Sequence, residues 1–357
     1  MGAQGIRPTW PKDQMDLSAW IGQRDDGGGG GGGGGGGIRF RSCIINASGA
    51  RCSTAEELAA LARSRSSAVV TKSCSLEPKE GNAQPRYYHG YVGCVSINST
   101  GLANGGHEYY LEALRGLADG ADGADGTDGA DGARVPHIVS VACLGLEDTR
   151  VVLDEVLRSE AVDAVELNVS CPNVCDSDTI MAYHFLEMDQ YLEGLQPHIR
   201  DSVKPVGVKL PPYWEKQQFR KAVEVVVRHG FQFVTTINSI PNCLIIDSDT
   251  ESPVIRPKGG IGGLGGSSLL PVVLSNIHQM RRLLPPAVHV IGCGGIATGK
   301  DVFCHLLAGA SMVQVGTSLM LEGVGVFERL EAELADVLRA KGYQSVGEAV
   351  GGLRAME

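Results

Sequence analysis

Two carboxamides and a thiol follow one apolar run of this chain, within the stretch Glu-Leu-Asn-Val-Ser-Cys-Pro-Asn-Val at residues 166–174. The side chains of Asn168 and Asn173 can form hydrogen bonds with the donors and acceptors of a flat, imide-like ring, and the thiol of Cys171 can exchange a proton. Taken alone, Ser-Cys-Pro is more simply a turn beside a structural cysteine. Similar polar groups, however, end three further apolar runs, at residues 71–73, 96–99 and 236–239. This repetition favours one site built from several strand ends.

The segments that would position these groups alternate between short β-branched runs and stretches with the apolar spacing of helices. The runs predict eight strands, at residues 42–48, 68–73, 137–143, 164–170, 205–210, 233–239, 289–295 and 312–316. Helices are predicted at 108–117, 146–159, 214–229, 269–283 and 299–308. This order predicts an α/β fold, a TIM (β/α)8 barrel, which keeps its active site at the carboxyl ends of its strands. Residues 241–258 predict a hairpin inserted after the sixth strand.

Two low-complexity stretches interrupt the pattern: an unbroken glycine run at residues 27–37 and an Ala-Asp-Gly repeat at 119–132. Neither composition can bury enough apolar surface to offset the entropy of ordering, so both are expected to be flexible. We therefore expect a poorly ordered N-terminal segment over residues 1–41. Residues 42–357 should form one barrel domain with a flexible surface loop.

Composition excludes several classes of partner. The chain has 357 residues, with 31 Lys plus Arg against 41 Asp plus Glu and a net charge of −10, which disfavours nucleic acid. Apolar runs stay below the roughly 18 residues needed to cross a bilayer, so no membrane partner and a soluble, cytoplasmic protein are expected. The ten cysteines lack the paired spacing of iron–sulfur or zinc sites, so no metal is expected.

Glycines end the last two predicted strands, at residues 292–295 and at Gly316. Loops after strands seven and eight of a TIM barrel commonly bind phosphate through free backbone N–H groups. The Gly265–Gly266 pair adds to this signal. Because the chain has no Gly-x-Gly-x-x-Gly turn that opens a βαβ unit and is followed by a ribose-binding acid, a mononucleotide cofactor is favoured over a dinucleotide.

In their order and spacing, these motifs resemble dihydroorotate dehydrogenases, specifically the branch that uses a cysteine base and fumarate as electron acceptor. The resemblance begins near residue 46 and rests on residues 46–49, 71–74, 81–82, 85–87, 96–104, 167–174, 207–213, 238–242, 260–266 and 292–295. It implies FMN-dependent oxidation of (S)-dihydroorotate to orotate in pyrimidine biosynthesis. Hydride would pass to flavin N5 and the proton to Cys171, with fumarate then reduced to succinate. It also suggests a homodimer.

The resemblance implies roles for individual residues of this chain. The catalytic base would be Cys171. The substrate-binding residues would be Lys72, Asn98, Gly101, Leu102, Asn168, Asn173, Asn238 and Ser239. The cofactor-binding residues would be Ala47, Ser48, Gly49, Lys72, Ser73, Asn168, Lys209, Ile237, Gly265, Gly266, Cys293, Gly294, Gly295, Gly316 and Thr317. The ammonium of Lys209 can stabilise the negative charge that develops on a reduced flavin.

Two alternatives stay open at this point. One is a related FMN-dependent barrel oxidoreductase that acts on another pyrimidine, or uses NAD through an iron–sulfur partner; residues 207–213 and 260–266 favour the fumarate branch over it. The other is a flavin-binding scaffold without catalysis, which the presence of Lys72, Cys171 and Lys209 disfavours. Thr100, Ala103 and Pro241 depart from the family pattern, which bears on substrate affinity more than on reaction type.

Overall fold

The computed structural model describes residues 15–22, 37–90, 95–120, 134–170 and 179–356. Eight parallel strands form its central sheet, in the order β3-β16-β15-β10-β9-β8-β7-β4. They are β3 (Ile44–Asn46), β4 (Val69–Val70), β7 (His137–Ala142), β8 (Ala164–Asn168), β9 (Val206–Leu210), β10 (Phe233–Thr236), β15 (His289–Cys293) and β16 (Met312–Val315). Each predicted strand is present, shorter than predicted by up to four residues, so the (β/α)8 barrel is confirmed.

The barrel closes between β3 and β4 through a side chain. No β-ladder joins these two strands in the described part of the chain. Instead, the buried carboxamide of Asn46 accepts a hydrogen bond from the Val70 N–H at 2.8 Å and donates one to the Val70 carbonyl at 2.7 Å. The Ser67 N–H also donates to the Ile44 carbonyl at 3.1 Å. Asn46 therefore supplies the pair of hydrogen bonds that a neighbouring strand would make.

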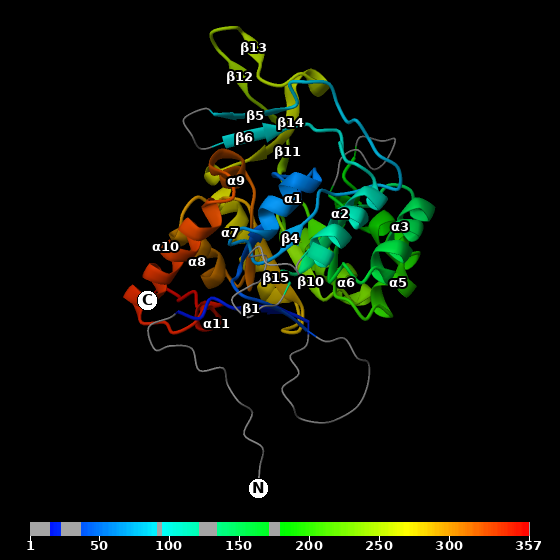
Figure 1. Ribbon diagram of the computed structural model, residues 1–357. Coiled ribbons are helices and arrows are strands. Elements are labelled where there is room, and N and C mark those ends of the chain that lie inside the picture. The colour runs from blue at the N-terminus through cyan, green and yellow to red at the C-terminus, as the bar shows by residue number, and fades with distance from the viewer. Residues whose placement is uncertain (1–14, 23–36, 91–94, 121–133, 171–178, 357) are drawn as a thin grey trace.

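Helices surround the barrel (Figure 1). They are α1 (Ala55–Ala62), α2 (His107–Gly120), α3 (Leu146–Arg158), α4 (Phe185–Glu193), α5 (Gln196–Arg200), α6 (Lys216–His229), α7 (Leu270–Leu283), α8 (Gly299–Ala308), α9 (Thr317–Glu322), α10 (Val326–Lys341) and α11 (Val346–Ala349). Local sequence fixes several starts: Thr298 and Asp301 form a reciprocal capping box at α8. All five predicted helices are present within a few residues of their predicted ends.

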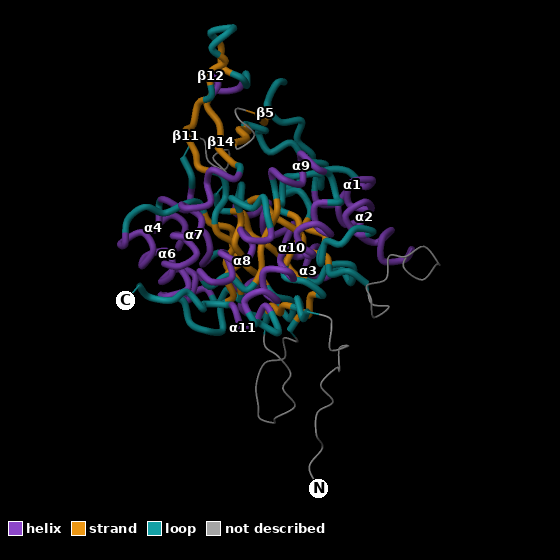
Figure 2. The backbone as a smooth tube through the Cα atoms, turned by 90° about the vertical axis from the view of Figure 1, so that its left-hand side faces the viewer, coloured by secondary structure: helices purple, strands orange, loops and turns teal. Residues whose placement is uncertain are grey.

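A four-stranded antiparallel sheet lies over one end of the barrel (Figures 1 and 2). It has the order β11-β14-β6-β5, with β5 (Tyr87–Gly90), β6 (Val95–Asn98), β11 (Ile240–Leu244) and β14 (Ile261–Gly265). The pair β12 (Ile246–Asp247) and β13 (Ser252–Pro253) extends from it as the tip of the predicted inserted hairpin. The prediction that residues 96–99 end a strand like those of the barrel was wrong. They belong to β6 and its end, because a polar side chain after an apolar one looks the same in parallel and antiparallel strands.

The opposite end of the barrel is covered by a short antiparallel pair, β1 (Ala19–Ile21) and β2 (Ile38–Phe40). Ile21 and Phe40 are fully buried, and the ring of His289, at the start of β15, contacts the Gly22 carbonyl at 3.3 Å. Both strands lie inside the segment expected to be poorly ordered. Their few apolar side chains are buried because they cover the barrel floor. The glycine run and most of the Ala-Asp-Gly repeat lie outside the described residues.

Candidate functional site

A cavity of about 370 Å³ lies where the carboxyl ends of the barrel strands meet the antiparallel sheet. The predicted site residues within the described ranges all line it, and they come from both layers. They are Ala47, Ser48, Gly49, Lys72, Ser73, Asn98, Gly101, Leu102, Asn168, Lys209, Ile237, Asn238, Ser239, Gly265, Gly266, Cys293, Gly294, Gly295, Gly316 and Thr317. Cys171 and Asn173 lie outside the described residues. The structure thus brings the predicted residues together, and their individual roles stay predictions.

One edge of the cavity is built almost entirely from glycine backbone, at Gly265, Gly266, Gly294, Gly295 and Gly316. A Cβ placed on Gly265 would lie 2.8 Å from Ser96 Oγ, and one on Gly295 would lie 2.5 Å from the Cα atom of Leu270. A side chain is therefore excluded at Gly295, where the neighbouring atoms are backbone, and crowded at Gly265, and the glycine backbone of this edge faces whatever fills the cavity. This is the kind of surface that approaches a phosphate group closely.

Hydroxyl groups tie this glycine edge to the sheet above it. Ser96 Oγ in β6 and Thr317 Oγ1 at the start of α9 are 2.9 Å apart and share a hydrogen bond. Ser96 belongs to the antiparallel sheet, whereas Thr317 follows the last barrel strand. The two layers are therefore joined directly at the cavity wall.

Lys209 carries a buried charge in the cavity wall, with 3% of its side chain exposed. Its Nζ donates to Gln314 Oε1 at 2.9 Å and lies 3.7 Å from Glu166 Oε1. Burial alone would lower the pKa of Lys209, but the acidic groups of Cys293 and Glu166 outweigh it, and the pKa is raised. Burial raises the pKa of the Cys293 thiol, and Glu166 is the one carboxyl group among these neighbours of Lys209. Lys209 is therefore a fixed ammonium.

Carboxamides line the other side of the cavity and hold one another in place. Asn168 donates from Nδ2 to Ser73 Oγ at 3.1 Å, and its Oδ1 accepts from the Ser170 N–H at 3.1 Å and from Asn238 Nδ2 at 3.3 Å. Asn98 donates to the Gly263 carbonyl at 3.2 Å. These bonds orient Asn168 and Asn238 from the barrel and Asn98 from the antiparallel sheet, so a ring in the cavity would meet donors and acceptors that are already positioned.

Several lining residues were not predicted. Gln314, Tyr87, Ser96, Lys258 and Gly263 all line the cavity. Gln314 had a usable signal, because it is the one polar residue in the apolar strand β16, and a polar side chain inside a buried parallel strand needs a partner. Tyr87, Ser96 and Gly263 lie in the antiparallel sheet, and Lys258 lies just before it in the inserted segment. Their pairing is long-range, so the local sequence gave no comparable signal.

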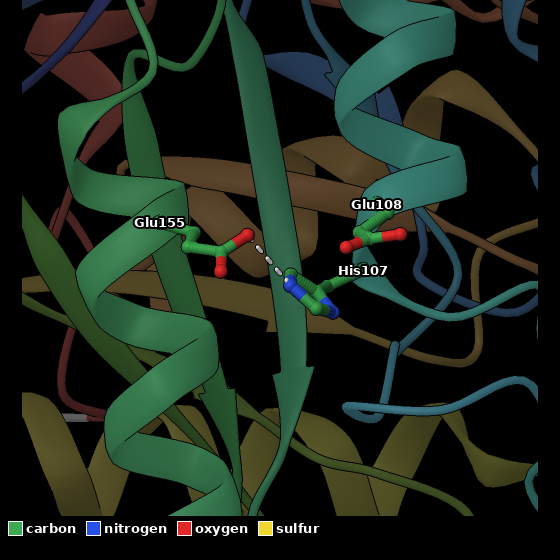
Figure 3. A group of neighbouring side chains, drawn as sticks. All are labelled: His107, Glu108 and Glu155. Carbon is green, nitrogen blue, oxygen red and sulfur yellow. Dashed lines mark hydrogen bonds and ion pairs between the residues drawn. The ribbon is translucent and has the colours of Figure 1, made fainter.

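A second group of ionisable side chains, His107, Glu108 and Glu155, lies on the helices α2 and α3 (Figure 3), and none of them lines this cavity. His107 is buried at the start of α2. Its Nε2 is 2.9 Å from Glu155 Oε2 in α3, and its Nδ1 is 2.9 Å from the Leu76 carbonyl. Both ring nitrogens are thus engaged by protein acceptors, so the group is explained as a link between two helices and is not assigned as a metal site.

The fold and the cavity are those of an α/β-barrel enzyme with its site at the carboxyl ends of the strands. Residues 36–338 match the family model described as dihydroorotate dehydrogenase. The chain belongs to this family of oxidoreductases, whose members generally use a flavin. The resemblance drawn from the sequence is therefore confirmed.

Streptococcal relatives named dihydroorotate dehydrogenase A (fumarate) are similar along almost the whole chain. The protein from Streptococcus pyogenes serotype M3 is 41% identical over 315 residues, covering 88% of this chain and 95% of the relative. The protein from Streptococcus agalactiae serotype Ia is 40% identical over 310 residues, covering 87% and 94%. The crystal structure of ligand-free DHODH from Eimeria tenella has a TM-score of 0.74 at 19% identity, covering 97% of this chain and 94% of that one. This last likeness supports the fold.

Proposed function

We propose that this chain oxidises (S)-dihydroorotate to orotate with tightly bound FMN and passes the electrons to fumarate. The observation that carries the proposal is the single cavity in which a glycine edge, a buried ammonium and a set of oriented carboxamides face one another. The names of the streptococcal relatives support the choice of substrate and acceptor.

The described residues support FMN as the flavin. The exposed backbone at Gly294, Gly295 and Gly316 suits one phosphate group, and the Lys209 ammonium suits the edge of the ring that becomes negative on reduction. A flavin held here would supply a hydride acceptor for dihydroorotate and, in the second half-reaction, the electron pair for fumarate. The residues named here would bind and orient the cofactor.

The remaining residues would hold the substrate. Dihydroorotate carries imide-like edges, which Asn98, Asn168, Asn238 and Ser239 can meet with paired donors and acceptors, together with Asn173. Its carboxylate would be neutralised by Lys72, whose side chain lines the same cavity. These groups would orient the ring of dihydroorotate in the cavity.

Cys171 would accept the proton that dihydroorotate loses from the neighbouring carbon. A thiol with an ordinary pKa of about 8.5 ionises far more readily near neutral pH than a serine hydroxyl does. Its place in the sequence supports the role, because it follows Asn168 by three residues at the end of β8, whose terminal carboxamide lines the cavity.

The proposal is tested by following the flavin itself. The protein is purified and denatured, and the released chromophore is identified; FMN is expected. In the native protein, dihydroorotate should bleach the flavin absorbance without oxygen, and fumarate should restore it. A bleached flavin that fumarate leaves reduced while NAD reoxidises it would point to the related NAD-using branch. A protein without flavin that cannot be reconstituted with FMN would refute the proposal.

The proposal extends to the organisation of the protein. Residues 42–357 would form the FMN-binding domain, and the described part of residues 1–41 contributes β1 and β2 at the barrel floor. No described helix combines the length and apolar character needed to cross a membrane. The family resemblance supports a cytoplasmic homodimer. Sedimentation equilibrium of the purified protein tests the dimer, for which a mass near twice 37.6 kDa is expected.

A further inference from the structure

Four polar side chains form a connected layer inside the barrel, directly beneath the cavity. They are Glu166 in β8, Lys209 in β9, Thr235 in β10 and Gln314 in β16, and none is more than 3% exposed. Barrel interiors are usually filled by branched apolar side chains. Lys209 and Gln314 line the cavity, whereas Glu166 and Thr235 lie below it and do not. Lys209 and Gln314 can therefore contact a ligand in the cavity, whereas Glu166 and Thr235 can act on that ligand only through Lys209 and Gln314.

The hydrogen bonds within this layer run in one direction, toward Glu166. Thr235 Oγ1 donates to Glu166 Oε2 at 2.6 Å, and Gln314 Nε2 donates to the same oxygen at 2.7 Å. Because Gln314 gives its amide N–H to Glu166, its carbonyl oxygen is turned toward Lys209 and accepts from Nζ at 2.9 Å. The carboxylate of Glu166 thus decides which end of the Gln314 amide meets the lysine.

Glu166 also acts on Lys209 through its charge. Its second oxygen, Oε1, has no hydrogen-bond partner among the described residues and lies 3.7 Å from Lys209 Nζ. The other ionisable groups that act on Lys209 are the buried thiols of Cys293 and Cys52, and burial raises the pKa of both. Glu166 is therefore the one carboxyl group among these neighbours, 3.7 Å from the ammonium.

We propose that Glu166 is a positioning residue for Lys209: it orients the ammonium through Gln314 and supplies the counter-charge that keeps it ionised when the cavity is filled. This inference rests on one part of the proposed function, namely that a flavin binds in the cavity. It assigns no contact between Glu166 and either cofactor or substrate.

The first test compares the midpoint potential of the bound flavin in the parent, Glu166→Gln and Glu331→Gln. Glu331 is the matched control: it is also buried, paired with Arg65 at 2.8 Å and left with one unbonded oxygen, but it lies in α10 and does not line the cavity. The potential is measured by chemical reduction against a reference dye, from about pH 6 to about pH 9, without dihydroorotate.

Glu166→Gln should add a pH-dependent break to the potential that the parent and Glu331→Gln lack, because a buried lysine without its counter-charge loses its proton more readily. On the acidic side of the break the potential should lie above that of the parent, since the unbalanced ammonium favours the more negative, reduced state. Glu166→Asp keeps the charge and should restore a parent-like profile. A Glu166→Gln profile that superimposes on the parent at every pH would overturn the inference.

The second test uses thermal melting of flavin-free protein and does not depend on the proposed function. Glu166→Gln leaves a buried ammonium unbalanced, and Lys209→Met leaves a buried carboxylate unbalanced, whereas the double variant removes both charges. The double variant should melt at a higher temperature than either single variant. If Glu166→Gln fails to fold, the double variant should still fold. A double variant whose loss of stability equals the sum of the two single losses would show that the two residues are not coupled and would overturn the inference.

Discussion

Gly295 offers the sharpest test of how the glycine edge of the cavity works. Its backbone has φ +79°, a conformation that costs an ordinary residue about 1–2 kcal/mol. A Cβ at this position would lie 2.5 Å from the Cα atom of Leu270 and 2.8 Å from its nitrogen. Both are backbone atoms, so neither can turn away, and the loop must move by roughly 1 Å to reach ordinary contact distance. Gly295→Ala should therefore displace the backbone that faces the proposed phosphate.

The matched control is Gly342→Ala at the end of α10. Gly342 has φ +82°, but a Cβ there would meet no atom within 4 Å, and the residue does not line the cavity. Gly342→Ala should therefore have the same conformational cost of a positive φ as Gly295→Ala, but no steric clash. In Gly295→Ala, the displaced backbone should lose contact with the phosphate of FMN. A loss of about 1.4 kcal/mol or more in binding free energy corresponds to at least a tenfold rise in the Kd for FMN. Gly342→Ala should leave that Kd at the parent value.

Fluorescence titration of flavin-free protein with FMN and with riboflavin measures both effects. In the parent, FMN should bind more tightly than riboflavin by the contribution of the phosphate. In Gly295→Ala this difference should shrink, because riboflavin has no phosphate to lose contact with. If Gly295→Ala binds FMN as tightly as the parent does, the glycine edge does not hold the phosphate, and the reasoning from its geometry fails.

Three further predictions concern chemistry, composition and pH. Cys171→Ser should slow flavin reduction by dihydroorotate by roughly 10²–10⁴-fold, while FMN binding persists. The residual rate of the variant should increase toward higher pH, because a serine hydroxyl ionises less readily than a thiol. Stopped-flow reduction across a pH series checks this, and a rate and pH profile like those of the parent would exclude Cys171 as the base. Deleting residues 121–131 should leave flavin content and turnover near parent values, because an Ala-Asp-Gly repeat cannot contribute to a packed core; loss of flavin from the deletion variant would contradict this. Burial lowers the pKa of His137 to about 4, below its unfolded value of about 6.5, so the folded state binds the proton less readily. The free energy of unfolding should therefore fall by up to about 3 kcal/mol as pH drops from about 6.5 to about 4, and a His137→Gln variant, measured by urea denaturation, should lose part of this dependence.

The barrel could be predicted because each of its strands has a local signal. In β9, Val206 to Leu210 are all buried, as expected of a strand covered on both faces, and the sequence shows this as a nearly continuous apolar run. The polar residue that interrupts that run, Lys209, was for the same reason identifiable as part of the site. The barrel strands could be predicted because the apolar run that identifies each strand lies within that strand's own segment of the sequence.

The antiparallel sheet could not be predicted in this way. Its strands come from two distant parts of the chain, and β6 pairs with β14 across more than 160 residues, with Asn98 opposite Gly263. The inserted hairpin was visible from residues 241–258, but nothing local in it specifies its partner. Ser96 therefore appeared to end a strand like those of the barrel, when it actually lies in the layer above.

The polar layer beneath the cavity shows the same limit at the level of single side chains. The sequence shows Glu166 as a charged residue inside the apolar strand β8. Its hydrogen-bond partner Gln314, however, lies 148 positions later and approaches Glu166 only when the barrel closes, so the role of Glu166 could not be inferred from the sequence. An apolar set of similar volume would stabilise the interior, since a buried ion pair seldom repays its desolvation. Glu166 even keeps one oxygen without a hydrogen bond. A barrel that retains the buried pair of Glu166 and Lys209 beside the cavity gives up stability at the place where the cavity needs a fixed positive charge. This placement argues that the layer serves the site rather than the fold.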